Sequence, residues 1–329
     1  MRKISKYIIF CLIFFILASC GDSGKKKTGT TSTSGTITLM CDNSFENIMQ
    51  QEIDVFEYQY PKAHILARYI PQKDAVDSLM EGKTKAIVIT RDITEAERKK
   101  LEGMRKVVKS RKIAVDALAL IVNPENPIEM LSKEEIGDIL TGKVSNWNEL
   151  EPNNTGEIKI YFDDAKSSTV QYMQDSLMNG QPFSENVYAQ GSIQKVFEAV
   201  RTRKNAVGII GVSWITSDMQ NNIATEELAQ QLQGEGAESV AEFDSRVKVL
   251  KVMGNDTREA FKPYQQYIYD GSYPLFRQIY MIISAPNGTL EHGFYSFVTG
   301  FIGQKIILKT GIMPAVIQPQ IVEIVDPNQ

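Results

Sequence analysis

The chain has 329 residues, with 36 lysines and arginines against 40 aspartates and glutamates, which gives a formal net charge of −4 at pH 7. This balance argues against nucleic acid or an anionic membrane surface as the partner, because both attract clustered positive charge. Hydrophobic residues make up 43% of the chain, and its length predicts about two domains with a substantial core.

The first twenty residues, MRKISKYIIFCLIFFILASC, predict export and lipidation. A basic start is followed by an apolar run from Tyr7 to Leu17 and by the lipobox sequence LASC, which ends at Cys20. We therefore expect residues 1–19 to be a cleaved signal peptide and Cys20 to carry the lipid. An uncleaved anchor is the alternative, but the apolar run is shorter than the roughly 20 residues that span a bilayer.

A short linker and a single remaining cysteine follow from this assignment. Residues 20–35 are polar and rich in Gly, Ser and Thr, which is typical of a flexible spacer between a lipid and a folded part. Cys11 leaves with the signal and Cys20 is acylated, so Cys41 alone remains. An intrachain disulfide is therefore excluded, and packing must hold the fold.

From residue 36 onward, strand patterns alternate with helical patterns. The expected elements are strands over 36–41, 65–69 and 86–90 and helices over 45–56 and 75–80. Thr94 and Glu97 form a capping box that predicts another helix. This βαβαβ order predicts a mostly parallel sheet with helices on its faces, and such sheets bind ligands where strand carboxyl ends meet helix amino ends.

A second α/β unit follows. The apolar run 113–122 predicts a strand that ends at the turn sequence NPENP, and Ser132 with Glu135 predicts another capped helix. The further expected elements are strands over 158–162 and 206–212, helices over 168–178 and 192–203, an exposed helix with a loop in the acidic stretch 226–242, and an apolar segment over 278–284.

Five blocks of the sequence, taken in order, are similar to the PstS-like phosphate-binding protein family, the extracytoplasmic receptors of bacterial phosphate ABC importers. The blocks are AVDALALIVNPENPI at 114–128, LSKEEIGDILTGKVSNWNEL at 131–150, AVGIIGVSWI at 206–215, YPLFRQIY at 273–280 and GQKIILKTGIMP at 303–314. No block is diagnostic alone, so the ordered set carries the resemblance.

The resemblance implies a type II periplasmic binding fold, in which two α/β lobes are joined by two crossing strands and close on a ligand like a hinge. The crossings are expected near 113–117 and 273–279. We expect residues 36–113 and 279–329 to form lobe 1 and residues 114–278 to form lobe 2.

An oxyanion held without a metal or cofactor needs several converging donors, which helix amino termini and hydroxyls supply. Ser44 and Phe45 match the family position where a hydroxyl and the next backbone N–H bind phosphate. Ser167, Ser168 and Thr169 fall where the family has Ser-Gly-Thr at the start of a lobe 2 helix. Helix capping alone is the alternative at both places.

Two positions depart from the family pattern. Asp163 occupies the position of the family arginine, and Arg91 occupies that of a carboxylate at the end of the third strand. We expect the roles to be exchanged, with Arg91 donating to the anion and Asp163 or Asp164 pairing with it or accepting the ligand proton. Thr90 and Gln72, the latter at a family serine position, complete the expected ligand-binding residues.

The alternative for Arg91 is a surface salt bridge with Asp92 or Glu95, which would be worth little. If no carboxylate reaches the ligand, phosphate selectivity is in doubt, because an acceptor is what separates protonated phosphate from sulfate. An unpaired buried acceptor costs about 1–3 kcal/mol.

The leading hypothesis is a monomeric, lipid-anchored extracytoplasmic receptor that presents inorganic phosphate to an ABC permease, at the periplasmic face or the cell surface. The exchange at Arg91 and Asp163 keeps an alternative open, namely a receptor-fold protein that binds another oxyanion or serves in sensing or adhesion. An enzyme is not expected, because the sequence contains no G-x-S-x-G elbow, no H-E-x-x-H pair and no phosphate loop.

Overall fold

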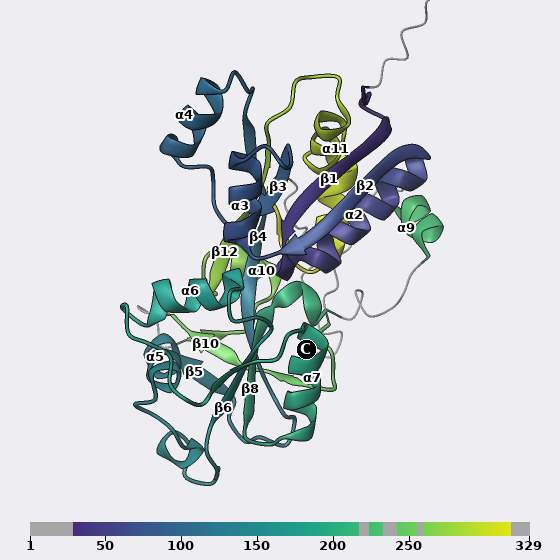
Figure 1. Cartoon of the computed structure of the whole chain (residues 1–329). Helices are drawn as coiled ribbons and strands as arrows, with labels where there is room; N and C mark the ends of the chain where they lie inside the picture. The colour runs from purple at the N-terminus through teal and green to yellow at the C-terminus, as the bar shows by residue number, and fades with distance from the viewer. Residues whose placement is uncertain (1–28, 217–223, 233–241, 255–258, 317–329) are drawn as a thin grey trace, which may run out of the picture.

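The computed structural model describes residues 29–216, 224–232, 242–254 and 259–316, so the predicted signal and Cys20 lie outside the described residues. Figure 1 shows two α/β halves, one above the other, with two strands running between them. No helix within the described ranges is long and apolar enough to cross a membrane.

The upper half contains the parallel sheet that the first βαβαβ pattern predicts. Strand β1 (Ser34–Asp42) pairs in parallel with β2 (Lys62–Ile70) and with β3 (Ala86–Ile89). Helices α2 (Glu46–Gln59) and α3 (Gln72–Met80) contribute to two different apolar clusters, so they cover opposite faces of this sheet. The alternation of strand side chains separates the clusters.

Two strands join the halves. Strand β4 (Lys109–Val122) is antiparallel to β12 (Phe276–Ile283), and the middle of β4, at Ala114 and Val115, also pairs with β13 (Met313–Pro314). The second part of β4 pairs instead with β8 (Ala206–Gly211) in the lower half. The strand order β2-β1-β3-β12-β4-β8-β6-β7 therefore passes from one lobe to the other, which confirms two lobes joined by two crossing strands.

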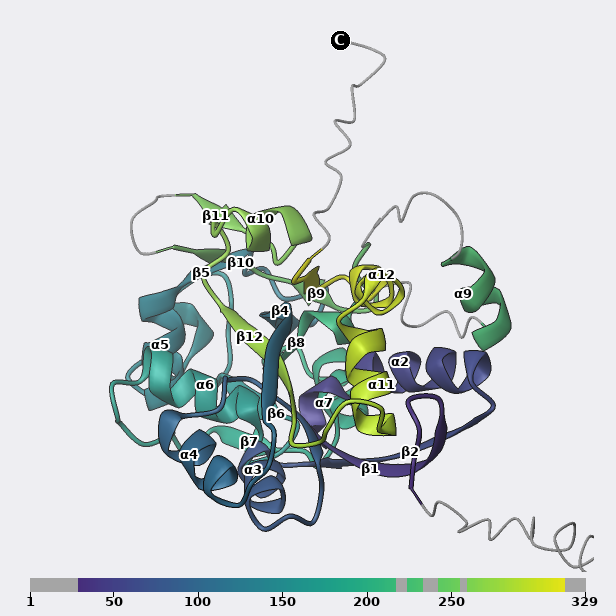
Figure 2. The ribbon, with the colours of Figure 1, turned by 90° about the horizontal axis from the view of Figure 1, so that it is seen from above.

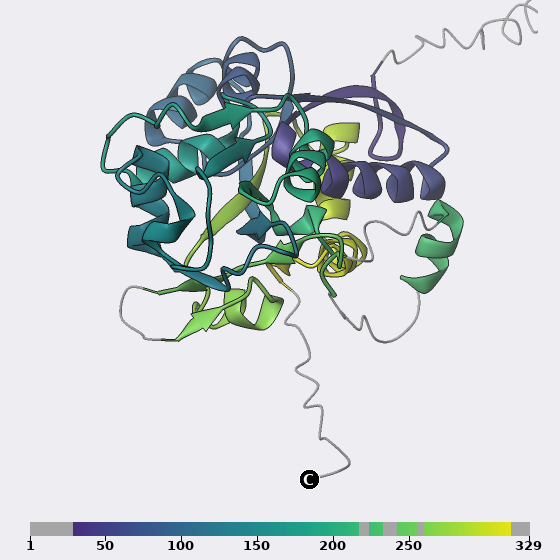
Figure 3. The same cartoon turned by 90° about the horizontal axis from the view of Figure 1, so that it is seen from below.

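The lower half is built on the other end of this sheet. Strand β8 pairs in parallel with β6 (Lys159–Phe162), and β6 pairs in parallel with β7 (Val187–Ala189). The helices of this half are α5 (Lys133–Thr141), α6 (Ser168–Leu177) and α7 (Ile193–Thr202). A small sheet of β5 (Met130–Ser132), β10 (Lys251–Met253) and β11 (Ala260–Phe261) lies at one edge, beside α10 (Gln265–Tyr269), as Figures 2 and 3 show.

The remaining elements complete the two lobes. They are the short helices η1 (Asn43–Phe45), η2 (Trp147–Glu149) and η3 (Val212–Trp214), the helices α4 (Glu95–Gly103), α11 (Leu290–Val298) and α12 (Phe301–Lys309), and the strand β9 (Lys248–Val249). Both predicted capping boxes are present, at the start of α4 and at the start of α5. Local sequence therefore sets where these helices begin.

Helix α9 (Thr225–Gln231) differs from the expectation. The sequence places it in lobe 2 as an exposed helix, but Leu228 and Ala229 are buried against Val55 of α2 and Ile306 of α12 in lobe 1. Figures 1 and 2 show α9 beside α2. An apolar stripe on a short helix needs a partner surface, and here the other lobe supplies it. Residues 233–241 of the acidic stretch lie outside the described residues.

Candidate functional site

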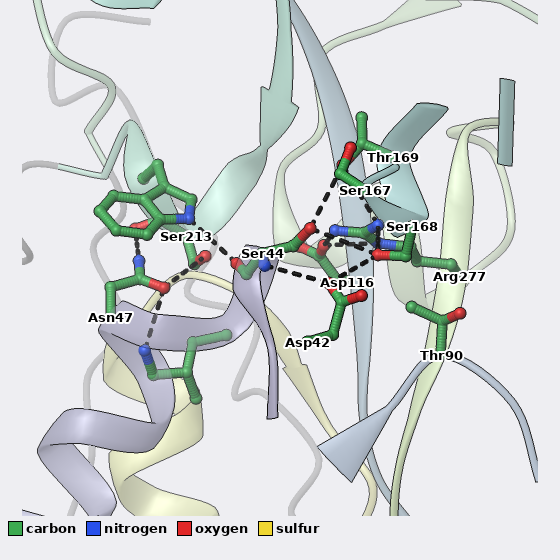
Figure 4. A network of polar contacts seen from close by, with 12 residues as sticks. Asp42, Ser44, Asn47, Thr90, Asp116, Ser167, Ser168, Thr169, Ser213 and Arg277 are labelled. Carbon is green, nitrogen blue, oxygen red and sulfur yellow. Dashed lines mark hydrogen bonds and ion pairs between the residues drawn. The ribbon is translucent and has the colours of Figure 1, made fainter. Parts of the chain in front are cut away.

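Hydroxyl groups from the two lobes meet at the junction between them. Ser44 lies in η1, directly after β1, and Ser168 and Thr169 are the first two residues of α6. The Ser44 Oγ lies 3.3 Å from the Ser168 Oγ and 3.4 Å from the Thr169 Oγ1 (Figure 4). All three residues are buried. The structure thus brings together the hydroxyls of the two helix starts that the sequence singles out.

Capping explains why these two chain segments have their local shape. The Ser167 Oγ accepts a hydrogen bond from the Val170 N–H at 3.3 Å and so caps α6. The Asp42 carboxylate accepts one from the Ser44 N–H at 3.0 Å and caps η1. Capping is therefore carried out by Asp42 and Ser167 and not by Ser44 and Ser168, whose hydroxyls face one another.

A buried guanidinium completes the donor set. Arg277 on β12 is 4% exposed, and its Nη1 donates to the Ser168 Oγ at 2.7 Å and to the Thr169 Oγ1 at 3.3 Å. Its Cζ lies 4.9 Å from the centre of the Phe45 ring, a distance typical of a cation–π contact. The prediction did not include Arg277, although it lies within the block YPLFRQIY, at a buried position in a strand of alternating burial.

Arg277 is paired with Asp116 on the neighbouring crossing strand. The two residues are opposite one another in the β4–β12 register, with Arg277 Nη2 2.9 Å and Nε 3.0 Å from Asp116 Oδ2. Burial raises the pKa of Asp116 above its ordinary value, although the Arg277 charge acts to lower it. The signal available in the sequence was a lone charge inside the apolar run IAVDALALIV.

Strand β8 passes close to this ion pair at Gly211. A Cβ atom there would lie 3.1 Å from Asp116 Oδ2 and 3.7 Å from Arg277 Nη2. Because a larger side chain would crowd both partners, glycine at this position allows β8 to lie against the pair.

Asp42 is a second functional candidate that the prediction missed. Its Oδ1 accepts hydrogen bonds from the Ser44 N–H and from the Ser168 hydroxyl, the latter at 2.8 Å, so it contacts both lobes. The residue is fully buried, and its Oδ2 has no hydrogen-bond partner among the described residues. The sequence places it immediately at the end of β1, where a carboxylate faces the amino end of a helix.

Asp163 lies in the same neighbourhood, at the end of β6. It is 4% exposed, and its Oδ1 makes no hydrogen bond in the part of the chain that the structure describes. Burial raises the pKa of Asp163, and the charge of Asp42 adds to the rise, while the Ser167 hydroxyl and the Arg277 charge oppose it. Asp163 stands four residues before Ser167, on the loop between the end of β6 and the start of α6.

Arg91 is placed outside this cluster. Its Nη1 and Nη2 donate to the two carboxylate oxygens of Glu97 at 2.9 and 2.7 Å, and its side chain is 39% exposed. The hydrogen bond from Arg91 is the main reason that the pKa of Glu97 falls to about 2. The structure thus differs from the expected exchange of roles: Arg91 forms the surface ion pair, with Glu97 rather than Asp92 or Glu95, because the first turn of α4 lies within its reach.

Gln72 and Thr90 bind to one another at the side of the cluster. The Gln72 Oε1 accepts from the Thr90 N–H at 2.7 Å and from the Thr90 hydroxyl at 2.6 Å. The amide of Gln72 donates to the Gln171 Oε1 of α6 at 3.4 Å. Gln72 thus contacts the other lobe, but through α6 rather than through the serine hydroxyls.

A second set of contacts joins the lobes behind Ser44. The Asn47 Nδ2 donates to the Ser213 backbone oxygen at 3.0 Å, and the Trp214 Nε1 donates to the Ser44 backbone oxygen at 3.0 Å (Figure 4). Ser44 is therefore bound to the other lobe through both its carbonyl oxygen and its hydroxyl. If the two lobes move apart, both contacts of Ser44 must break.

The cluster has the chemistry of a binding site. The hydroxyls of Ser44, Ser168 and Thr169 and the guanidinium of Arg277 offer donors. The carboxylates of Asp42 and Asp163 offer acceptors. Among the described residues no group of three or more His, Cys, Asp or Glu side chains is arranged to hold a metal ion.

Comparison with known proteins agrees with the two-lobed architecture. The sequence model of the PBP superfamily domain matches residues 26–302. The phosphate-binding protein PstS of Pseudomonas aeruginosa is 23% identical over 304 residues, which cover 86% of this chain and 84% of that protein. The PstS of Bacillus subtilis is 24% identical over 225 residues, which cover 66% of this chain and 73% of that protein.

Solved structures show the same fold. A phosphate ABC transporter substrate-binding protein from Clostridium perfringens, solved with bound phosphate, matches with a TM-score of 0.66 and 23% identity, covering 85% of this chain and 100% of that one. An ABC-type phosphate transport receptor from Vibrio cholerae matches with a TM-score of 0.61 and 19% identity, with the same coverage.

Proposed function

Because the chain belongs to the PBP superfamily, we propose that it is the phosphate-binding receptor of an ABC importer, whose two lobes close around the anion. The observation that carries the proposal is the meeting of Ser44 from one lobe with Ser168 and Thr169 from the other, beside the buried guanidinium of Arg277. The curated relatives are named as phosphate-binding proteins, which agrees with this chemistry.

The donors suit a tetrahedral oxyanion. Hydroxyl groups and a guanidinium form short, charge-assisted hydrogen bonds with anionic oxygens. The first N–H groups of α6 have no partners within the helix and add a favourable dipole at the same place. In this proposal the ligand oxygens take over the hydrogen bonds that Ser44, Ser168 and Thr169 now share, so that the anion links the lobes.

Calorimetric titration tests the proposal directly. The chain from residue 21 onward is suitable, because the described fold begins after residue 28. We expect saturable heat with inorganic phosphate and binding at least tenfold weaker with sulfate, which brings no proton for a buried carboxylate. The Ser168→Ala variant should bind about 5- to 10-fold more weakly, since one hydrogen bond to an anion is lost.

A matched control separates binding from helix capping. Ser132 caps α5 through its hydroxyl and forms no hydrogen bond with the hydroxyl cluster in the part of the chain that the structure describes, so Ser132→Ala should leave phosphate affinity unchanged. Absence of heat with phosphate, or equal losses in the two variants, would contradict the proposal.

The cluster has more carboxylates than cationic groups, which favours a second candidate function. The chain would then be a receptor-fold protein that binds another oxyanion or serves in sensing or adhesion rather than uptake. Titration with molybdate and arsenate beside phosphate distinguishes the ligand. Phosphate uptake by cells that lack the gene distinguishes transport from sensing, because a receptor used only for sensing leaves uptake intact.

Membrane attachment through acylated Cys20 belongs to the same proposal, with the receptor working as a monomer outside the cytoplasm. The lipobox and the polar linker support it. The full chain should partition with membranes and incorporate a labelled fatty acid, whereas Cys20→Ser should lose the label. Labelling that persists in this variant would overturn the anchor.

A further inference from the structure

The cluster contains more negative than positive groups. Asp116 pairs with the guanidinium of Arg277, Asp42 shares the Ser168 hydroxyl with it, and Asp163 lies on the loop that leads to the start of α6. Each of these four residues is at most 4% exposed. Asp116 pairs with Arg277 through its Oδ2, so its charge is compensated although its Oδ1 has no hydrogen-bond partner among the described residues. Asp42 and Asp163 each keep one carboxylate oxygen, Oδ2 and Oδ1 respectively, without a hydrogen-bond partner within the described ranges.

An anion without protons does not suit this arrangement. Buried acceptors that stay unpaired are costly, and a dianion placed beside ionised carboxylates is repelled by them. A monoanionic ligand that donates a hydrogen bond to each carboxylate pairs both acceptors and, with one charge instead of two, is repelled less. Its remaining oxygens are then available to the Arg277 guanidinium and to the hydroxyls of Ser44 and Thr169.

Given the proposed function, on which this step rests, we propose that the site takes the oxyanion as a doubly protonated monoanion, with Asp42 and Asp163 as two separate proton acceptors. Asp42 is then a specificity-determining residue as well as the cap of η1. Its Oδ2 accepts the hydrogen bond from the second ligand proton. Its Oδ1 accepts the hydrogen bond from the Ser168 hydroxyl of the opposite lobe.

The other titratable groups around the cluster do not compete for this role. Burial raises the pKa of the Cys41 thiol, next to Asp42, well above its ordinary value, and burial also raises that of Tyr172 on α6. Both groups therefore stay neutral up to about pH 8. Asp116 is bound to Arg277, and Glu46 of α2 is exposed.

The proposal predicts proton uptake on binding. Where phosphate is mainly the dianion, at about pH 8, each binding event should take up about one proton from solution. The apparent affinity should fall about tenfold per pH unit above the second ionisation of phosphate, because the monoanion fraction falls in that proportion. Both quantities follow from calorimetric titrations with inorganic phosphate in buffers of different ionisation enthalpy.

Asp42→Asn is the deciding variant. It leaves one acceptor, which a dianion with its single proton can satisfy, so proton uptake at about pH 8 should fall close to zero and the pH dependence should flatten. Asp163→Asn should act in the same direction and covers the case that Asp42→Asn fails to fold. Asp175→Asn, on the exposed side of α6, is the matched control and should keep the full proton uptake.

The possible outcomes distinguish the two-acceptor site from the receptor function. Phosphate binding that takes up no proton at about pH 8 in the unaltered chain refutes the two-acceptor site and leaves the receptor function standing. Absence of phosphate binding at every pH refutes the receptor function itself. Uptake of a proton that persists in both Asp42→Asn and Asp163→Asn overturns the assignment of these residues.

Discussion

Arg277 lies directly opposite Asp116 across the two strands that join the lobes, with its Nη2 2.9 Å from the Asp116 Oδ2. The same guanidinium donates through Nη1 to Ser168 at the start of α6. One side chain therefore takes part in both the connection between the lobes and the hydroxyl cluster.

Removing this guanidinium should affect stability and binding together. We expect Arg277→Gln to lower the free energy of unfolding by about 3–5 kcal/mol, because Asp116 is left as an uncompensated buried charge. Phosphate affinity should fall by about 10- to 100-fold with the loss of a charged donor. Urea denaturation and calorimetric titration measure the two effects.

The double variant Asp116→Asn with Arg277→Gln separates the effect on stability from the effect on phosphate binding. It should recover much of the stability, since no unpaired charge remains, without recovering the affinity. Restored phosphate binding in the double variant would show that Arg277 only neutralises Asp116.

Arg91→Ala should leave phosphate affinity within about twofold, because its guanidinium is bound to Glu97 outside the cluster. The pKa of Glu97 is lowered to about 2 in the folded chain, so the pair stabilises the fold above the ordinary glutamate pKa, and this contribution is lost as the pH falls toward 2. The variant should therefore be less stable by up to about 1 kcal/mol near pH 7 and equal to the unaltered chain near pH 2. Urea denaturation across this range checks it, and a tenfold loss of phosphate affinity would place Arg91 back in the site.

Glu52 on α2 should make the fold less stable as the pH rises. It is fully buried, neither carboxylate oxygen has a hydrogen-bond partner among the residues described, and burial raises its pKa well above the ordinary value. The unfolded chain releases this proton above the ordinary glutamate pKa, so the folded state loses stability from there up to the raised pKa. We expect Glu52→Gln to become progressively more stable relative to the unaltered chain between about pH 5 and about pH 8.

The control for this prediction is Glu102→Gln, at an exposed position near the end of α4. It should follow the unaltered chain at both pH values in urea denaturation. A constant difference between Glu52→Gln and the unaltered chain would mean that Glu52 does not titrate on unfolding.

Fluorescence should follow the closing of the lobes through one of the two tryptophans. Trp214 donates to the Ser44 backbone oxygen across the lobes, whereas Trp147 is fully buried within lobe 2. If phosphate closes the lobes, the ligand-dependent change in emission should disappear in Trp214→Phe and persist in Trp147→Phe. The opposite pattern would place the movement away from Ser44.

The sequence predicted most of the fold because its signals are local. The capping boxes at Thr94 and Ser132 and the alternation of strand and helix patterns depend on neighbours along the chain, and the structure has both features. The placement of α9 could not be obtained in this way. Its apolar stripe indicates that Leu228 needs a partner surface but does not say which lobe supplies it.

The two helix starts that meet at the junction were visible for a similar reason, while their binding of an anion stays a prediction. The two helix starts, marked by Ser44 and Ser168, are visible in the sequence as hydroxyls after strands. The pairing of Asp116 with Arg277 depends on the register of two strands about 160 residues apart, which no local pattern encodes. Arg91 was assigned to the anion because it occupies the family's carboxylate position; its ion pair with Glu97, which also serves the capping box of α4, was not among the alternatives.

Strand β4 links the two ends of one continuous sheet, since its first part pairs with β12 and its second part with β8. A slip of one residue along this strand would turn every following side chain to the opposite face. Asp116 would then point away from Arg277, and residues 117–122, which are buried on both faces of the sheet, would exchange the faces against which they pack. One residue inserted or deleted near the start of β4 should therefore disrupt both the Asp116–Arg277 ion pair and the packing of lobe 2. A second change within one lobe could not restore both.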